Sequence, residues 1–146
     1  MKTPALSEIS FALLRLVTGL LFMMHGGQKL LGWFGGVGGG GGAPVHMASV
    51  MGIAALLELV GGTLVMLGLI TRPIAFLLSG EMAFAYFTAH QPHGIWPIQN
   101  HGELAVLYCF IFLFMAAHGA GVYSLHSLLF RGRHTRSAGR PLHVGA

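Results

Sequence analysis

The sequence has little charge. Only 8% of its 146 residues are Asp, Glu, Lys or Arg, whereas about 25% are charged in a typical soluble domain. Hydrophobic residues make up 54%, and the mean hydropathy is +0.72. So few charged side chains cannot cover a surface that faces water. The composition therefore excludes an ordinary soluble domain and indicates a membrane protein, whose length suggests a single domain.

Cysteine is almost absent. The single cysteine, Cys109, lies in an apolar run, so neither an internal disulfide nor a dithiol relay is available. No H-E-x-x-H or E-x-x-H spacing occurs, and we therefore predict no metal site, although histidine and carboxylate groups would suit iron or zinc.

The net charge of +4 does not indicate a nucleic-acid partner. Half of the eight basic residues follow the last apolar stretch, where positive charge commonly marks the cytoplasmic side of a membrane span. They are Arg131, Arg133, Arg136 and Arg140. We expect this basic tail to contact anionic membrane lipid.

Long apolar runs dominate the rest of the sequence. The first, from Phe11 to Leu31, has the length of about 20 residues that a helix needs to cross a bilayer. Three more runs follow, separated by a glycine-rich loop, a Thr-Arg-Pro turn and a loop around Trp96. We predict an all-α integral membrane four-helix bundle over residues 1–130, with a basic cytoplasmic tail at 131–146. The predicted helices are about 9–31, 45–70, 73–90 and 103–130, with a break near Gly119 left open.

The distribution of positive charge predicts the orientation. An even number of spans places both termini on one side, together with Arg15, Arg72 and the arginine tail, whereas Lys29 falls on the other side. The positive-inside rule then makes the termini cytoplasmic. We therefore expect a multi-pass protein of the bacterial cytoplasmic (inner) membrane.

Several ionisable residues lie inside the predicted spans, where a charge is costly and often functional. Counted from the outer helix ends, His25, Glu58 and Glu81 fall at similar depths, with Lys29 close by and Glu103 at the outer mouth of the last helix. Three interpretations follow. The cluster pairs internally and holds the helices together, it binds a small ligand or quinone head group and carries protons, or it binds a metal.

The order of short motifs resembles that of the DoxX family, a group of small bacterial four-helix membrane proteins. The matching pieces run from about Leu13 to Leu125 and include His25-Gly26 through Lys29-Leu30, Glu58-Leu59-Val60-Gly61-Gly62, Gly68-Leu69-Ile70-Thr71-Arg72 and Asn100-His101-Gly102-Glu103. The sequence departs from the family pattern at His101, where glycine is frequent, and at His126, where aspartate is common.

The resemblance implies a four-helix membrane bundle in a redox setting. One branch of the family looks like a subunit of a thiosulfate:quinone oxidoreductase, and some members associate with oxidative-stress enzymes. The family pattern falls on Arg15, His25, Lys29, Glu58, Arg72 and Glu103.

We therefore expect an accessory or quinone-interacting subunit of a membrane redox system, with protein partner subunits and a homo-oligomer left open. His25, Lys29, Glu58, Glu81 and Glu103 are the ligand-binding or proton-carrying candidates, and quinone is the candidate ligand. Arg15 and Arg72 are expected to anchor the cytoplasmic side. The alternative is a non-catalytic membrane scaffold. A small-solute permease is less favoured, because no internal repeat or broken-helix pair is evident.

Overall fold

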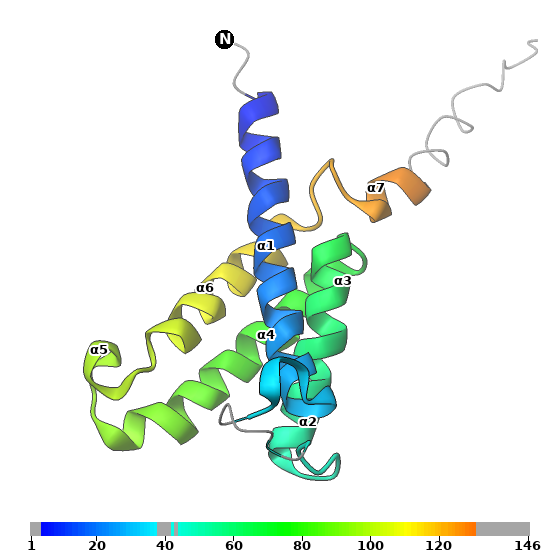
Figure 1. Ribbon diagram of the computed structural model, residues 1–146. Helices are drawn as coiled ribbons and strands as arrows, with labels where there is room; N and C mark the ends of the chain where they lie inside the picture. The colour runs from blue at the N-terminus through cyan, green and yellow to red at the C-terminus, as the bar shows by residue number, and fades with distance from the viewer. Residues whose placement is uncertain (1–3, 38–41, 43, 131–146) are drawn as a thin grey trace, which may run out of the picture.

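The fold is seen in a computed structural model, which describes residues 4–37, 42 and 44–130. The described residues are helical or irregular and contain no strand. Four long helical segments follow one another along the chain (Figure 1). The predicted tail at 131–146 lies outside the described residues.

The first segment, α1 (Pro4–Leu31), is one uninterrupted helix. It begins five residues before the predicted position 9, because proline is well tolerated in the first turn of a helix, where its missing N–H is not needed. A single 3₁₀ turn, η1 (Trp33–Gly35), follows. The Trp33 ring covers Gly27 so closely that a Cβ atom there would overlap it.

The second segment consists of α2 (Val50–Leu56), the π-helical turn η2 (Leu57–Gly61) and α3 (Gly62–Leu67). It is shorter at both ends than the predicted helix 45–70. At its start, the Ser49 hydroxyl accepts a hydrogen bond of 3.0 Å from the Gly52 N–H and caps the helix. At its end, Gly68 is left-handed with φ 71°, a frequent way to terminate a helix.

The third segment, α4 (Thr71–Ala85), continues into the π-helical turn η3 (Tyr86–His90). It begins two residues before the predicted position 73, so that Thr71 and Arg72 belong to its first turn. The residue before it, Ile70, is left-handed with φ 48°. A β-branched residue rarely adopts this conformation, so the turn between α3 and α4 is tight and strained.

The predicted helix 103–130 is two helices, α6 (Glu103–His118) and α7 (Leu125–Phe130). Gly119 has φ 92° and ψ −161°, a conformation that ends α6 and that other residues rarely adopt. The predicted loop before α6 contains the short turns η4 (Gln91–His93) and α5 (Pro97–Asn100). Asn100 organises this loop, since its amide donates to the Gly94 carbonyl at 2.6 Å and its side-chain oxygen accepts from the Gly102 N–H at 2.8 Å.

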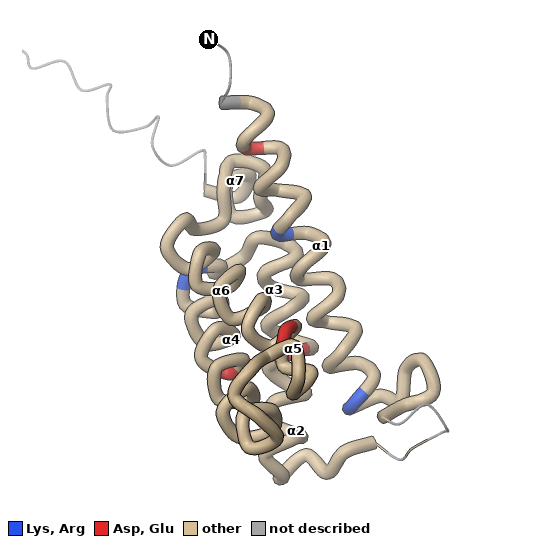
Figure 2. Tube along the Cα trace, turned by 90° about the vertical axis from the view of Figure 1, so that its left-hand side faces the viewer, with Lys and Arg blue, Asp and Glu red and all other residues tan. Residues whose placement is uncertain are grey.

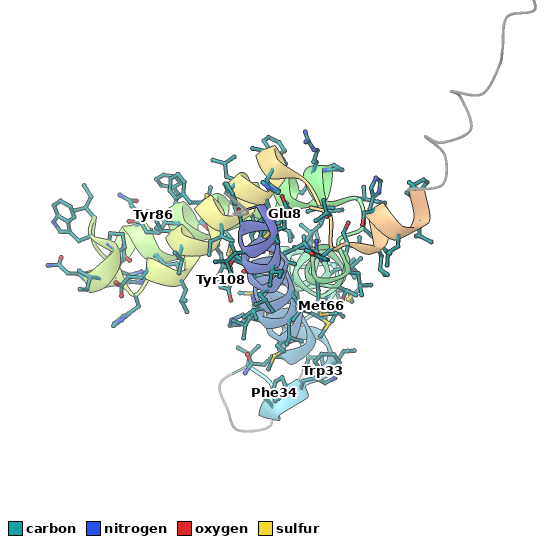
Figure 3. All side chains as sticks on the ribbon, turned by 90° about the horizontal axis from the view of Figure 1, so that it is seen from above. Glu8, Trp33, Phe34, Met66, Tyr86 and Tyr108 are labelled. Carbon is teal, nitrogen blue, oxygen red and sulfur yellow. The ribbon has the colours of Figure 1, made fainter. Side chains whose placement is uncertain are left out.

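The helices form two pairs that diverge. Helix α1 packs along α2, η2 and α3, and α4 packs along α6. Figure 1 shows the α4–α6 pair extending away from α1 and α3 at an angle, with α5 at its far end. Tyr86 lies toward this far end of the α4–α6 pair (Figure 3). Aromatic contacts join the pairs, among them Phe22 to Phe112 with ring centres 4.8 Å apart. We call the end of the molecule beyond these contacts, where α1 finishes, the Lys29 end.

Apolar side chains cover much of the outside. Phe76, Phe87 and Phe110 are each about two-thirds exposed, at 65%, 66% and 64%. Charged positions along the chain are few (Figure 2). Two segments are long and apolar enough to cross a membrane, Ala5–Leu31 and Val50–Leu67, and Glu103–His118 is a shorter apolar helix. Such a surface suits lipid far better than water.

Candidate functional site

A cavity lies between the two helix pairs at the Lys29 end. Its volume is about 490 Å³, within the range of roughly 300–1,000 Å³ that is usual for small-molecule sites. Most of its wall is apolar. The residues with polar side chains on it come from α1, η2, α4, η3 and α6, and they are His25, Lys29, Glu58, Glu81, Thr88, His90 and Tyr108.

One ion pair crosses the wall of the cavity. The Lys29 ammonium group lies 2.6 Å from Oε1 of Glu58, and only 4% of the Glu58 side chain is exposed. The second carboxylate oxygen of Glu58 is buried without a hydrogen-bond partner among the described residues. The pair therefore joins α1 to η2 and neutralises a deeply buried charge.

Close backbone contact aligns these two elements. A Cβ atom on Gly26 would lie 2.6 Å from the Ala55 carbonyl oxygen, so α1 can approach the second segment this closely only with glycine there. Gly62 makes the reciprocal contact, since a Cβ on it would lie 2.5 Å from the Met23 nitrogen. The contact brings Lys29, one turn beyond Gly26, beside Glu58.

Glu58 lies in the π-helical turn η2. A π-helical turn adds a residue within a helix and is frequently found at functional sites. The turn continues into α3 without a break in the helical backbone, because Gly61 and Gly62 both keep right-handed helical angles. The π-helical turn of this segment therefore contains the segment's one buried acidic residue, Glu58.

Glu81 reaches the same cavity from α4. Both of its carboxyl oxygens are buried, and neither has a hydrogen-bond partner among the described residues. Buried polar groups are almost always hydrogen-bonded, so an unpartnered carboxyl group on a cavity wall is a feature that needs an explanation.

Tyr108 and His25 complete the polar wall on the side where α6 faces α1. The Tyr108 ring packs on Phe22 with ring centres 5.3 Å apart and lies 6.5 Å from the His25 ring. Tyr108 is half-buried on this wall. His25 is exposed at the side of the cavity, unlike the buried Glu58.

The structure thus brings together four of the five predicted ligand-site residues, His25, Lys29, Glu58 and Glu81, around one cavity. Glu103 is not one of the lining residues and is exposed at the start of α6. Across the described residues, no three His, Cys, Asp or Glu side chains come close enough to hold a metal ion.

The two predicted anchors lie away from this cavity. Arg15 is 4% exposed, donates to the Tyr123 carbonyl at 2.7 Å and also donates to the Ala120 carbonyl. Arg72 is exposed and makes one long contact of 3.4 Å with the His118 carbonyl. It lines a second cavity of about 400 Å³ beside the loop that follows α6.

Sequence reasoning did not select Tyr108, Thr88 or His90 as site residues. For Tyr108 a signal was present, because its hydroxyl is a polar group within the apolar run of α6 and a buried tyrosine usually finds a hydrogen-bond partner. Thr88 and His90 fall at the end of the predicted helix 73–90. Their place on the wall depends on the angle between the helix pairs, which the sequence does not encode in any local pattern.

The DoxX family model matches residues 10–91 of the chain. An "Uncharacterized protein" of Haemophilus influenzae is 41% identical over 123 residues, which cover 82% of this chain and 90% of that protein. The chain belongs to the DoxX family. DoxX proteins are membrane proteins, and the apolar exterior described above agrees with this.

A second relative of this DoxX protein carries a functional name. It is a Bacillus subtilis protein named "Putative oxidoreductase CatD", which is 32% identical over 128 residues, covering 86% of this chain and 91% of that protein. No solved structure matches the chain. The family model covers the chain from within α1 to the end of η3 and therefore includes His25, Lys29, Glu58 and Glu81.

Proposed function

We propose that this DoxX protein spans the bacterial cytoplasmic membrane four times, with both termini in the cytoplasm. The four spans would be α1, the α2–η2–α3 segment, the α4–η3 segment and α6. The exposed apolar side chains along these segments support this arrangement, as does the gathering of Arg15 and Arg72 away from the Lys29 end.

Within that frame, the cavity at the Lys29 end binds the head group of a quinone-like lipophile, and the protein acts as an accessory or quinone-interacting subunit of a membrane redox system. The observation that carries this proposal is a cavity of about 490 Å³ that combines an apolar wall with a buried ion pair and a buried carboxyl group without a partner. A few polar groups in an apolar cavity are the usual composition of a ligand site. The similarity to a protein named as an oxidoreductase supports a redox setting.

The residues present suit the chemistry of a quinone head. Its carbonyl oxygens need hydrogen-bond donors, which Tyr108, His25 and the acid form of Glu81 can supply. Reduction of a quinone also takes up protons, and histidine and carboxyl groups are the usual carriers. Electrons would come from a partner subunit, so this chain binds and orients the head and moves protons.

One observation favours a second candidate, a non-catalytic membrane scaffold. The Lys29–Glu58 pair joins α1 to η2, and Arg15 joins α1 to the loop after α6. In this reading both contacts only hold the helices together, and the protein supports neighbouring subunits through its apolar faces.

The deciding experiment measures quinone retained by protein that is purified in its native lipid. Ala54 lines the cavity from α2, whereas its neighbour Ile53 is 56% exposed and does not. We expect Ala54→Phe to fill part of the cavity and lower the quinone-to-protein ratio at least fivefold by mass spectrometry. The matched control Ile53→Phe should retain the wild-type ratio.

Wild-type protein that carries no quinone, but carries neighbouring subunits in fixed stoichiometry, would support the scaffold instead. Equal quinone in both variants would place the ligand outside this cavity.

A further inference from the structure

Glu81 is the carboxyl group on the cavity wall with neither oxygen paired among the described residues, whereas Glu58 has one oxygen paired with Lys29. Lys29 is the single Lys or Arg on the described cavity wall, and it is already paired with Glu58. The other titratable groups that face the cavity are His25 from α1, His90 from η3 and Tyr108 from α6. None of them forms a hydrogen bond with Glu81, whose two oxygens are both buried without a partner.

This position suits a neutral carboxylic acid better than a carboxylate. An ionised Glu81 would be a second negative charge beside Glu58, with one ammonium group to serve both, in surroundings of low dielectric. The acid form removes that charge and gains an O–H donor. The donor then needs an acceptor oxygen, and no described protein group provides one.

The residues at the mouth of the cavity indicate which kind of ligand could supply the acceptor oxygen. Its rim carries apolar side chains that are largely exposed, among them Met51 at 51%, Phe84 at 56% and Leu104 at 60%. They come from α2, α4 and α6, so the opening lies between the two diverging helix pairs. In a membrane such a rim meets lipid chains, and it favours a ligand with an apolar tail.

We propose that Glu81, as a neutral acid, donates a hydrogen bond to an acceptor oxygen on the head of an uncharged membrane lipophile whose tail leaves the cavity between α2 and the continuous α4–η3 segment. This inference rests on the proposed function and names its ligand class. It requires a neutral oxygen acceptor in the head, and it disfavours lipophilic cations, which would need an ionised Glu81.

Two probes with the same tail separate these ligand classes. Decyl-ubiquinone has a neutral head with carbonyl oxygens, and decyltrimethylammonium has a cationic head that accepts no hydrogen bond. Binding of each is measured to protein in phospholipid nanodiscs and corrected for partition into empty nanodiscs. The variants are Glu81→Gln, which keeps a donor but no charge, Glu81→Leu, which keeps neither, and the control Glu103→Gln, which removes a carboxylate outside the cavity.

We expect decyl-ubiquinone to bind wild-type protein, Glu81→Gln and Glu103→Gln with affinities within about threefold of one another. Glu81→Leu should bind about tenfold more weakly, the loss expected for one hydrogen bond. Decyltrimethylammonium should bind no better to wild-type protein than to empty nanodiscs. Thermal unfolding of each variant confirms that it is folded.

Two results would overturn the inference while leaving the proposed function standing. One is decyl-ubiquinone binding that Glu81→Leu does not change. The other is a decyltrimethylammonium affinity that Glu81→Gln abolishes, which would make Glu81 an anionic site for cations. If neither probe binds wild-type protein, the proposed function itself fails.

The position of the tail is tested on η3. Thr88 lines the cavity, whereas the adjacent Phe87 is 66% exposed and does not. We expect Thr88→Trp to weaken decyl-ubiquinone binding at least fivefold and Phe87→Trp to leave it unchanged. Equal affinities for the two variants would show that the tail does not pass η3.

Discussion

Arg15 and the carboxyl group of Glu81 are both buried and lie on helices that we place in the membrane, yet their surroundings differ. The Arg15 guanidinium donates to two backbone carbonyls, those of Ala120 and Tyr123. Glu81 has no partner for either oxygen within the described residues. The fold therefore engages both terminal nitrogens of Arg15, although its Nε is buried without a partner among the described residues, and engages neither oxygen of Glu81. Most of the Arg15 head group is thus held by the protein, as expected of a structural residue, whereas the Glu81 carboxyl group is left open, as expected of a ligand-binding residue.

The packing around the two residues also differs, since it is closer around Arg15 than around Glu81. Near Arg15, the left-handed Gly68 lies against both Arg15 and Ser124, so that a Cβ there would be 2.5 Å from the Ser124 Cβ. Around Glu81, the helix pairs diverge and enclose a cavity of about 490 Å³. Arg15 is thus held by close packing and hydrogen bonds, although a cavity of about 400 Å³ lies beside Ala120, whereas Glu81 faces its own cavity without a partner.

The largest expected effect on the free energy of unfolding is at Arg15. Arg15→Leu removes both hydrogen bonds to the loop after α6 and leaves two carbonyl oxygens without their donor. Hydrogen bonds from charged groups contribute roughly 1.5–3 kcal/mol each, so we expect the free energy of unfolding to fall by about 3 kcal/mol. Reversible unfolding in mixed detergent micelles measures this loss. The control Arg72→Leu, at an exposed site with one contact of 3.4 Å, should cost under about 1 kcal/mol, and equal losses would erase the distinction.

The next effect concerns the contact that aligns the cavity wall. Gly26→Ala places a methyl group against the Ala55 carbonyl oxygen and the backbone of Leu59, and such overpacking costs about 1–3 kcal/mol. The control Gly80→Ala lies on α4, where a new Cβ meets nothing within 4 Å. There we expect no loss, or a gain of up to about 1 kcal/mol from helix propensity. Similar results at both positions would argue against close packing of α1 on the second segment.

Breaking the ion pair should have an intermediate effect. Glu58→Gln leaves the Lys29 ammonium facing a neutral amide, and we expect a loss of about 1–2 kcal/mol, because Lys29 retains 22% side-chain exposure and can reach solvent or lipid head groups. The double variant Lys29→Met/Glu58→Gln should recover part of this loss, since no unpaired charge is left. Losses that simply add in the double variant would show that the pair contributes little.

Much of the fold could be predicted from the sequence because its local signals are strong. Apolar length predicted the helical segments, and glycine and proline predicted most of their limits. The differences at helix ends have local causes, such as the Ser49 cap, which makes the second helix start later than predicted. The break near Gly119, which the sequence left open, is present, since α6 ends there.

The site was predictable only in part. Similar depth was enough to group His25, Glu58 and Glu81, and all three line one cavity. Depth does not give direction around a helix axis, however, so the pairing of Lys29 with Glu58 and the isolation of Glu81 could not be deduced. Both depend on the close approach at Gly26, on the π-helical turn at Glu58 and on the angle between the helix pairs.

The smallest expected effect sharpens the contrast between the two carboxyl groups on the cavity wall. Glu81 makes no hydrogen bond and no ion pair that Gln would remove, so Glu81→Gln should change the free energy of unfolding by less than about 0.5 kcal/mol. The same substitution at Glu58 should cost several times more, although both residues lie in apolar helices at similar depth. Unfolding curves of the two variants under identical conditions compare them directly. A loss at Glu81 as large as that at Glu58 would mean that its carboxyl group holds the helices together, and the reason for regarding it as a ligand-binding group would disappear.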